Sequence, residues 1–523
     1  MSDERAADWT RWAVPLLVVL LAGAAFLPAL RHEFLNWDDA KNFVENPGYR
    51  GLGPRQLAWM FTAYHMGHYI PVTWLTFGFD YLLWGMNPAG YHLTNVLFHA
   101  AAALAVYALS RRLLRAALPD PAPRDVRIGA GLAALLFAVH PLRAESVAWV
   151  TERRDVVSGL LYALTVLTYL EAMESSDRAK PRWYWASVAV FALALLSKSI
   201  VVSLPVVLLA LDVYPLKRLG GARGWHRPRL WLEKVPYLVL GAAAAVVAFR
   251  ALFTLANSRS LGEMGPLYRA VLSIYGLAFY LWKSVMPFGL APLYQLDFTV
   301  TWLHFGAVAA LLALAVLLRR RAPAFMVATV AYVVTLLPVL GIFQNGPQAT
   351  ADRYTYLAGL GWAVILGGLA ARPWRGRAVT RVVLALWVLV MVPLTWQQVG
   401  IWRDSVTLWS HAVALAPQSR AAHFNLAGAH EEAGRYAAAV AEYEDVARLS
   451  NRFQGRWYIT IGWNYEKAKV DRLAIDAFRE ALRLEPGLAD ACDGVVRVAK
   501  RLGVEPGPRP GCPGSAPGAE KDA

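Results

Sequence analysis

The sequence predicts an all-α protein that crosses a membrane many times and ends in a region of helical repeats. Hydrophobic residues make up 57% of the 523 residues and charged residues only 17%, with a mean hydropathy of +0.37. These values lie outside the range of soluble globular domains. Runs of apolar residues long enough to cross a bilayer recur along the chain. After about residue 403 the runs stop and a repeat with a period near 34 residues begins.

The hydrophobic runs predict the membrane spans in order. The first run, 12–30, contains no charged residue, and because many runs follow it, a cleaved signal peptide is the weaker interpretation. The later runs lie near residues 91–110, 128–142, 155–171, 183–197, 199–214, 233–252, 268–286, 301–318, 323–342, 354–371 and 378–398. We expect about eleven of these runs to be true crossings.

Basic segments between the runs predict the sidedness. Arg and Lys cluster at residues 111–127, 178–182, 217–229, 319–321 and 372–381. The positive-inside rule places all of them in the cytoplasm, which requires one of the runs 233–252 and 268–286 to lie at the interface or to enter the membrane only partway. The formal net charge of +15 therefore reflects topology, and no nucleic-acid partner is expected. Residues 31–90 and 398–523 are predicted to lie outside.

The first outer segment combines an acidic pair with aromatic residues. "HEFLNWDDAKNFVENP", residues 32–47, places Asp38 and Asp39 directly after the first span. The residues that follow, up to 90, are rich in Trp, Tyr and Phe but interrupted by polar residues and Pro. They favour amphipathic helices in the headgroup region. The acidic pair could also be a simple helix cap.

Further polar residues lie at or near membrane depth, where such groups are costly and often functional. They form three groups, all predicted on the side of Asp38 and Asp39. The groups are His92, Asn95 and His99; His140, Glu145, Arg153, Arg154 and Asp155; and Asp352, Arg353 and Tyr356, with Lys198 at the same level.

The combination predicts chemistry on a phosphate-containing substrate. A carboxylate of the pair can act as a base, while its neighbour orients the acceptor or binds a divalent metal. The cations Arg153, Arg154, Lys198 and Arg353 would hold a donor phosphate, and the other polar residues would support them. The open alternatives are that the His and Asn residues join helices by hydrogen bonds and that the cations reach to headgroups.

The region after residue 403 is predicted to form repeats like those of tetratricopeptide (TPR) proteins. Ala439 and Ala474 lie about one period of roughly 34 residues apart. An incomplete preceding unit contains Trp409, Ala412 and Pro417. Such repeats stack paired helices around a concave groove, so this region either holds an acceptor peptide or caps the membrane domain.

Several of these motifs together resemble a known family. "NWDDAKNFVENP", "YIPVTWLTFGFDYLLWGMNPAGYHLTNVLFHA", "HPLRAESVAWVTERRD" and "ADRYTYL", followed by repeats, look like the transmembrane and TPR-repeat-containing O-mannosyltransferases and their bacterial relatives, within the GT-C glycosyltransferases. The sequence departs from the eukaryotic relatives at Ile70, where they commonly have Arg, and at Glu152-Arg153-Arg154-Asp155, where they have Gly-Arg-Ala-Asp.

The resemblance implies an inverting transfer of a sugar, mannose in the relatives, from a polyprenyl-phosphate donor to a protein Ser or Thr outside the cytoplasm. It places the catalytic carboxylate at Asp38 and Asp39. It also implies a GT-C-like domain at 1–400 with 31–90 as its first outer loop, and TPR-like repeats at 401–502. The Ala/Arg-rich composition suggests a bacterial inner membrane. Alternatives are transfer to a glycan or lipid, a transporter, and a non-catalytic scaffold.

The sequence at the end of the chain says little about structure or function. Residues 503–523 are rich in Pro and Gly and are predicted to be disordered. The two cysteines, Cys492 and Cys512, are too few for a metal site or a disulfide framework, and their number says almost nothing about the compartment.

Overall fold

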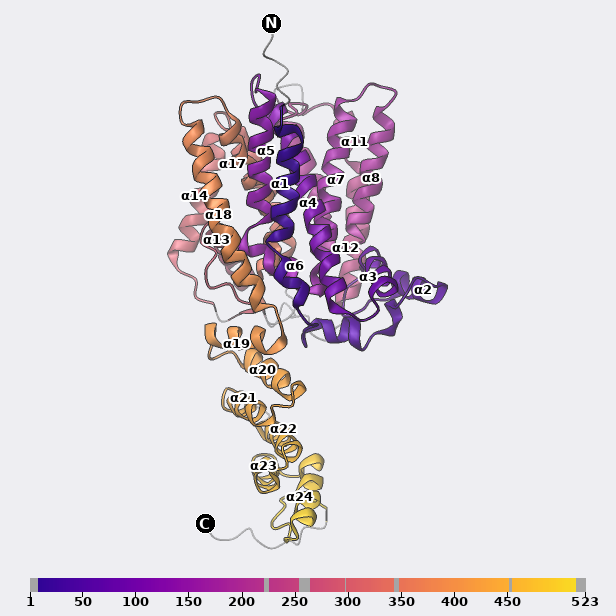
Figure 1. The fold of residues 1–523 in the computed structure, drawn as a ribbon, viewed down its shortest axis with the longest axis vertical. Coiled ribbons are helices and arrows are strands. Elements are labelled where there is room, and N and C mark those ends of the chain that lie inside the picture. The colour runs from indigo at the N-terminus through magenta and orange to yellow at the C-terminus, as the bar shows by residue number, and fades with distance from the viewer. Residues whose placement is uncertain are drawn as a thin grey trace. The chain divides into compact units, whose positions relative to one another are not determined.

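The chain forms two compact units in the computed structural model, which describes residues 8–220, 225–253, 264–296, 298–342, 348–450 and 454–513 (Figure 1). The membrane unit comprises Met1–Phe34 and Asp38–Arg403, and the helical unit comprises Leu35–Trp37 and Asp404–Ala523. Nearly all regular structure in the described residues is helical, which confirms the predicted all-α class. Arg223 of the predicted basic segment lies outside the described residues.

The membrane unit begins with a long helix and a set of shorter ones. These are α1 (Thr10–Ala24), η1 (Leu27–Arg31), η2 (Ala40–Val44), η3 (Pro47–Tyr49), α2 (Pro54–Thr62), α3 (Pro71–Trp84), α4 (Pro88–Ala117), α5 (Pro123–Ala138), η4 (Pro141–Arg143), α6 (Ala144–Ala148), η5 (Val150–Glu152) and α7 (Arg153–Glu174). Figure 1 shows α1, α4, α5 and α7 side by side, in agreement with their contacts.

The second half of the membrane unit continues in the same way. It contains α8 (Lys180–Leu195), η6 (Ser199–Ser203), α9 (Leu204–Val213), α11 (Pro228–Leu232), α12 (Val235–Phe253), α13 (Pro266–Val285), α14 (Trp302–Leu318), α15 (Pro323–Leu336), η7 (Leu337–Val339), η8 (Asp352–Tyr354), α16 (Thr355–Ala358), α17 (Leu360–Ala371) and α18 (Arg377–Ile401). Two short antiparallel strands, β1 (Tyr294–Gln295) and β2 (Gln348–Thr350), pair near η8.

Several helices have the length and composition of membrane spans. Within the described residues, five are long and apolar enough, and two bent pairs would raise this number to seven. The five are Thr10–Arg31, Pro88–Ala117, Val150–Glu174, Pro228–Leu252 and Arg377–Ile401. Other apolar helices, such as α14, are shorter. The count of about eleven crossings therefore stays a prediction.

Proline marks the start of many of these helices. α4, for example, begins at Pro88, directly after Asn87, whose side-chain oxygen accepts a hydrogen bond from the N–H of Ala89 at 3.1 Å. The first N–H groups of a helix have no partner within the helix, so Pro loses nothing at this position and its fixed φ favours the helical turn. The sequence thus sets where the helix starts.

The two ends of α4 lie in different surroundings. Near its last turn, Arg112 pairs with Glu171, and nearby basic segments are joined in the same way, with Arg381 2.7 Å from Asp125. Near its first turn, the carbonyl of Tyr91 accepts a hydrogen bond from Arg153 at 2.7 Å. A helix of 30 residues is about 45 Å long, so the predicted basic segments and the predicted site residues lie at opposite ends.

The chain turns sharply between α5 and α7, where many of the predicted site residues are found. The pair formed by Pro123–Ala138 and Pro141–Ala148 is bent by 58°. Three short helices, η4, α6 and η5, follow one another here because Pro141 interrupts the apolar helix and Trp149 adopts an extended conformation between α6 and η5. The turn collects residues 140–155 at one end of the helix bundle.

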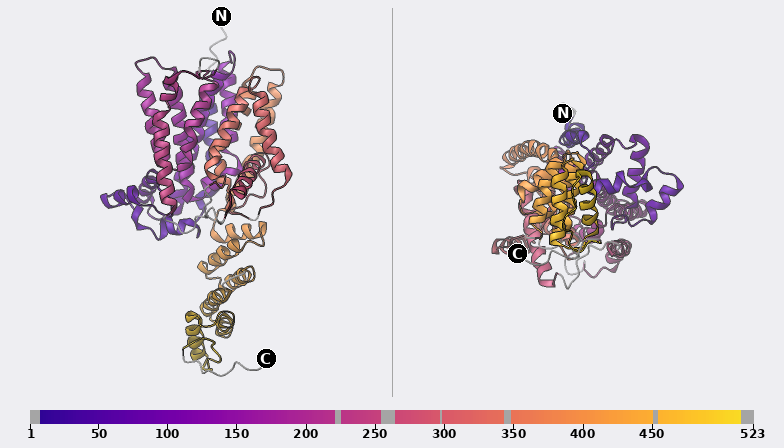
Figure 2. Two further views of the ribbon diagram at one scale, coloured as in Figure 1. Left: turned by 180° about the vertical axis from the view of Figure 1, so that it is seen from behind. Right: turned by 90° about the horizontal axis from the view of Figure 1, so that it is seen from below.

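The helices α2 and α3 project sideways from that same end of the membrane unit in both long views (Figures 1 and 2). They enclose a buried aromatic cluster, in which the hydroxyl groups of Tyr49 and Tyr91 lie 3.0 Å apart and Trp74 and Phe77 pack against Tyr49. The predicted helices in this aromatic segment are therefore present. Their placement in the headgroup region stays a prediction.

Within its described residues the helical unit contains six helices, each packed on the next (Figure 2). They are α19 (Ser405–Leu415), α20 (Arg420–Glu432), α21 (Tyr436–Arg448), α22 (Gln454–Lys467), α23 (Asp471–Leu484) and α24 (Ala489–Leu502). A Cβ atom on Gly462 would lie 2.6 Å from the ring of Phe478, and one on Gly494 would lie 2.8 Å from it. Glycine at these positions lets α22 and α24 approach the buried Phe478 from two sides.

The end of the helical unit differs from the sequence predictions in two respects. Cys492 of α24 and Cys512 form a disulfide bond, although their number gave no reason to expect one. Residues 504–513, which composition predicts to be disordered, lie against the helices, and the carbonyl of Pro510 accepts a hydrogen bond from the N–H of Gly487 at 2.9 Å. Residues 514–523 lie outside the described residues.

Candidate active site

The acidic pair has two different environments. Asp39 precedes η2 but makes no capping hydrogen bond through its side chain. Its Oδ1 instead accepts hydrogen bonds from the N–H of Thr151 at 3.0 Å and from Thr151 Oγ1 at 2.6 Å. Asp39 is fully buried, whereas Asp38 is half-buried. Asp38 is therefore the member of the pair that a substrate can reach.

Glu152 gathers three cations beside this pair. Arg154 Nε and Lys198 Nζ both donate to Glu152 Oε2, at 3.0 Å and 2.9 Å. Arg353 Nε lies 3.2 Å from Glu152 Oε1. The four side chains come from η5, α7, the residue before η6, and η8, and Glu152 is fully buried. A buried carboxylate with these partners holds distant parts of the chain together.

Two further carboxylates complete the arrangement. Lys198 Nζ donates to Asp155 Oδ1 at 2.6 Å, and Ser146 Oγ donates to Asp155 Oδ2 at 3.1 Å. The N–H of Arg353 donates to Glu145 Oε2 at 2.8 Å, and its guanidinium also pairs with this carboxylate. Below, "the charged cluster" means Glu145, Glu152, Arg154, Asp155, Lys198 and Arg353.

The charged cluster acts electrostatically on Asp38. Burial raises the pKa of Asp38 above its usual value, while the positive charges of Arg154 and Arg353 lower it and the negative charge of Glu152 raises it. A carboxyl group with a raised pKa binds a proton more tightly than a free one, which suits a general base, and the cations keep the deprotonated form available.

The cations of the cluster are already paired. Each of Arg154, Lys198 and Arg353 contacts at least one carboxylate, and all three are largely shielded from solvent. A phosphate that binds here therefore has to share these cations with Glu145, Glu152 and Asp155. The negative charge that develops on the phosphate as the sugar leaves would strengthen its hydrogen bonds to these cations.

Arg153 does not join the charged cluster. Its guanidinium is fully buried and lies 2.5 Å from Asp80 Oδ2, and its Nε donates to Asn95 Oδ1 at 2.6 Å. It also lies over the ring of Phe77, 4.2 Å from the centroid. These contacts occupy the side chain inside the aromatic cluster, so the structure gives Arg153 a different environment from that of its neighbour Arg154.

The predicted His and Asn stripe of α4 forms interhelical contacts. Asn95 Nδ2 donates to the carbonyls of Val147 and Trp149 at 3.2 Å and 3.3 Å. His99 lies 2.9 Å from both the hydroxyl of Tyr356 and the carbonyl of Ala138. These bonds tie α4 to the turn region and to α16, which is the packing alternative raised by the sequence.

The contacts of the remaining predicted residues are with residues outside the charged cluster. His92 is buried with its ring 5.6 Å from that of His32. His140 Nε2 lies 3.1 Å from the carbonyl of Ser284. Asp352 Oδ1 accepts a hydrogen bond from Tyr294 at 3.0 Å, so the β1 strand contacts the segment that carries Arg353.

Two residues at the site were missed by sequence reasoning, namely Glu152 and Thr151. Glu152 lies within the motif HPLRAESVAWVTERRD, and its position directly before the predicted cations Arg153 and Arg154 was a usable signal. Thr151 carries no signal by itself, because a single hydroxyl acquires its role only from the carboxylate placed opposite. Glu152 and Arg154, the two residues that replace Gly and Ala of the resembling family, form an ion pair with each other.

His68 follows a tight turn in the first outer segment. Met66 and Gly67 both have positive φ, 48° and 73°, and His65 and His68 pair across the turn. A positive φ is uncommon for Met. His68 is exposed at this turn.

The carboxylates of the charged cluster do not form a ready metal site. Across the described residues, one group of at least three potential ligands has its ligand atoms within 4.8 Å of one another, and it consists of His423, Glu442 and Asp445 in the helical unit. His423 Nδ1 lies 2.6 Å from Glu442 Oε2, which a hydrogen bond between α20 and α21 explains. The expectation of a divalent metal at the acidic pair stays open.

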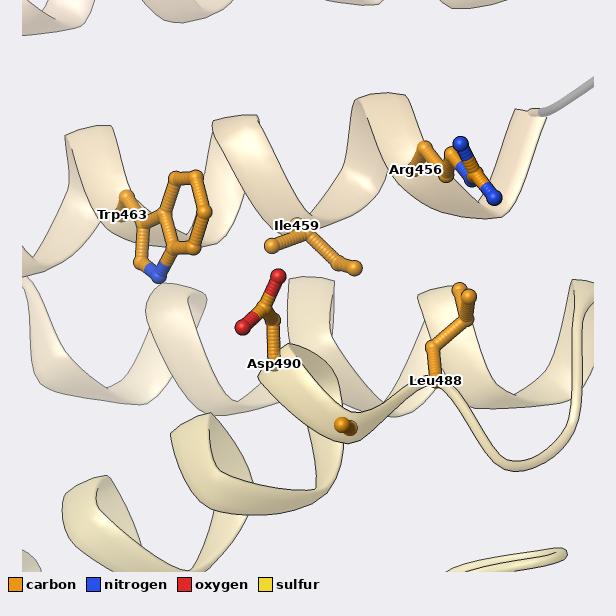
Figure 3. A pocket seen from close by; sticks show the side chains of 6 residues that line it. Arg456, Ile459, Trp463, Leu488 and Asp490 are labelled. Carbon is orange, nitrogen blue, oxygen red and sulfur yellow. The ribbon is translucent and has the colours of Figure 1, made fainter.

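A shallow pocket lies between α22 and α24 of the helical unit (Figure 3). It has a volume of about 330 Å³, and its lining includes Arg456, Ile459, Trp463, Leu488 and Asp490. In Figure 3 the carboxylate of Asp490 points toward the gap between Trp463 and Ile459. None of these residues was among the predicted site residues.

Comparisons with known proteins relate the chain to protein O-mannosyl-transferases. It is 24% identical to Protein O-mannosyl-transferase F38B6.6 of Caenorhabditis elegans, over 79% of this chain and 59% of that protein. It is 24% identical to Protein O-mannosyl-transferase Tmtc3 of Drosophila melanogaster, over 82% and 54%. It is 26% identical to Protein O-mannosyl-transferase TMTC1 of Homo sapiens, over 83% and 55%.

The chain thus spans a little over half the length of these relatives. No known family's sequence profile matches the chain, and no solved structure does. The similarity covers about four fifths of this chain.

Proposed function

We propose that the protein is a membrane glycosyltransferase that moves a sugar, mannose by analogy with its relatives, from a polyprenyl-phosphate donor to a Ser or Thr hydroxyl of a protein. The observation that carries this proposal is that Asp39, next to the half-buried Asp38, is hydrogen-bonded to Thr151, whose chain neighbour Glu152 binds Arg154, Lys198 and Arg353. A base and phosphate-binding cations are the two requirements of this transfer.

In the proposed reaction, Asp38 takes the proton of the acceptor hydroxyl as the hydroxyl oxygen attacks the anomeric carbon of the sugar. The bond between that carbon and the phosphate oxygen breaks, and polyprenyl phosphate leaves with the electron pair. Attack from the face opposite the phosphate inverts the configuration. Arg154, Lys198 and Arg353 stabilise the charge that develops on the phosphate, while Thr151 holds Asp39 and thereby the backbone beside Asp38.

The proposal includes the topology expected from the sequence: about eleven crossings in a GT-C-like fold, with TPR-like repeats after residue 401. The site and the repeats lie on the extracytoplasmic side of a bacterial inner membrane. Two observations support this sidedness. The basic segments lie at the end of α4 opposite the site. The helical unit also contains a disulfide bond, which persists in oxidising compartments such as the periplasm.

The experiment uses the purified full chain with a radiolabelled polyprenyl-phosphate sugar and a Ser/Thr-containing acceptor protein. Wild type is expected to release polyprenyl phosphate, and Asp38→Asn to lower this rate by about 100-fold or more. The matched control is Glu45→Gln, which removes an exposed carboxylate from the same outer segment and should leave the rate unchanged. Full activity of folded Asp38→Asn would exclude Asp38 as the base. Transfer of the labelled sugar to a glycan or lipid, and not to the protein, would exclude a protein acceptor.

A further inference from the structure

The pocket between α22 and α24 brings an aromatic ring and two opposite charges together within the helical unit (Figure 3). Arg456, Ile459 and Trp463 follow one another along α22 at spacings of three and four, so they share one face of that helix. Asp490 lies in the first turn of α24, on the other wall of the pocket. A carboxylate from one helix therefore stands opposite an indole ring and a guanidinium from the other.

The packing beside the pocket fixes the separation of its two walls. Gly462 of α22 and Gly494 of α24 both lie against the ring of Phe478. Ile459, which is 5% exposed, belongs to the same buried cluster as Phe478. The disulfide bond further ties α24 to the segment that returns along it. Walls held by a buried core move little, so the pocket is formed before any ligand binds.

The groups that face the pocket are open to solvent. Trp463 is 39% exposed, and Arg456 and Asp490 are exposed as well. Figure 3 shows the carboxylate of Asp490 pointing toward the gap between Trp463 and Ile459. The volume of about 330 Å³ lies at the lower end of the range for small-molecule sites. The pocket therefore suits a small ligand that reaches it from the surface.

The charges of the pocket disfavour ionic ligands. A cation would be attracted by the ring of Trp463 and the carboxylate of Asp490, but the guanidinium of Arg456 would repel it. An anion would meet the opposite conflict. Among the described residues that line the pocket, the formal charges of Arg456 and Asp490 cancel. The ligand that meets no opposing charge is a neutral one that both donates and accepts hydrogen bonds.

A hexopyranose has this chemistry. The C–H groups on one face of the sugar ring carry a partial positive charge, and they pack on the negative face of an aromatic ring such as that of Trp463. The sugar hydroxyls donate to a carboxylate, which only accepts, and accept from a guanidinium, which only donates. Hydrogen bonds to ionised groups are stronger than those between neutral groups. One sugar ring thus offers a partner to Trp463, Asp490 and Arg456.

We propose that this pocket is a carbohydrate-binding site that holds a hexose already attached to an acceptor protein. Trp463 is the stacking platform, and Asp490 and Arg456 bind the sugar hydroxyls. The choice of mannose as the hexose, and of a protein as its carrier, rests on the proposed function. A modified acceptor that is bound in this way stays tethered to the enzyme, which raises its effective concentration for transfer to further hydroxyls.

The test measures the binding of synthetic ligands to the purified full chain in detergent, so it requires no transferase activity. The ligands are methyl α-mannoside, a peptide with an α-mannosylated Ser or Thr, and the same peptide without the sugar. Binding is followed by calorimetry and by saturation-transfer NMR of the ligand. The pocket variants are Trp463→Ala, Trp463→Phe and Asp490→Asn. The matched control is Asp493→Asn, an exposed carboxylate about one turn later on α24 that does not line the pocket.

We expect both mannose-containing ligands to bind wild type with a Kd of about 1–10 mM, because one sugar ring has few atoms to contribute. The unmodified peptide should bind about tenfold more weakly or not at all. Trp463→Ala and Asp490→Asn should each weaken mannoside binding by about tenfold, and Trp463→Phe, which keeps an aromatic face, should weaken it less. Asp493→Asn should bind all three ligands as wild type does.

Three outcomes would overturn the proposal. Equal binding of the two peptides would assign the pocket to the peptide chain. Unchanged mannoside binding in folded Trp463→Ala and Asp490→Asn would place the sugar elsewhere on the protein. The third is that wild type binds neither mannose-containing ligand. If wild type releases no polyprenyl phosphate, the proposed function fails, and the binding measurements still decide whether the carbohydrate site exists.

Discussion

Thr151 donates two hydrogen bonds to one carboxylate oxygen of Asp39, from its backbone N–H at 3.0 Å and from its hydroxyl at 2.6 Å. Thr151 Oγ1 also accepts a hydrogen bond from Asn42 Nδ2 at 2.9 Å. The contact joins the first outer segment to the turn between α5 and α7. It separates the roles of the two adjacent aspartates, since Asp39 is held by the protein and Asp38 faces the charged cluster.

This contact predicts that Thr151→Val lowers the stability of the protein more than it lowers the rate of the reaction. The variant keeps the shape of the side chain and the backbone N–H but removes one charge-assisted hydrogen bond to a fully buried carboxylate. We expect a loss of about 1–3 kcal/mol in the free energy of unfolding, measured by denaturation in detergent, with a modest fall in kcat. Thr62→Val, at an exposed threonine of α2, is the control. Equal stability of both variants would refute the assigned role of Thr151.

The surroundings of Asp38 predict opposite pH shifts for two variants. Asp38 acts as a base only when deprotonated, so the rate falls as the pH drops through its pKa. Arg154 lowers this pKa and Glu152 raises it. Arg154→Gln should therefore raise the pKa and move the acid limb of the kcat profile to higher pH, whereas Glu152→Gln should move it to lower pH. Shifts of the same sign would contradict the assignment of Asp38 as the base.

The environments of Arg153 and Arg154 predict different effects of the same substitution. Arg153→Met leaves Asp80 buried without its cation, and breaking such a pair costs about 3–5 kcal/mol. Arg154→Met leaves Glu152 with Lys198 and Arg353, so stability should fall less while donor turnover falls more. Thermal unfolding and turnover of both variants are compared. A stable, inactive Arg153→Met would instead favour a direct role for Arg153 in donor binding.

The disulfide predicts how the helical unit responds to reduction. Removing a bond that closes a loop of 20 residues costs about 3 kcal/mol by loop entropy. Cys492→Ser should therefore lower the unfolding midpoint of the helical unit, and reductant should lower the midpoint of wild type by the same amount. Reductant should have no further effect on the variant. Two reactive thiols in the native, non-reduced protein would show that the bond is absent in solution.

Composition and local pattern were sufficient for the fold class. Apolar runs at 91–110, 155–171 and 378–398 became continuous helices, because an uncharged run has to satisfy its backbone hydrogen bonds internally. The starts of helices such as α4 followed from Asn87 and Pro88, which act within one turn. The order of the predicted spans also indicated which polar residues would lie at the same end of the helix bundle.

The pairing of those residues was decided by the tertiary structure. Arg153 and Arg154 are neighbours with the same chemistry, and only their directions on the first turn of α7 send one to Asp80 and the other to Glu152. The bond between Cys492 and Cys512 and the attachment of Asn36 to Trp409 depend on the return of distant segments. By itself the sequence determined which groups are costly to bury, because that is a property of each side chain. The partner that offsets each cost depends on which distant segments the fold brings together, and a local sequence pattern does not specify this.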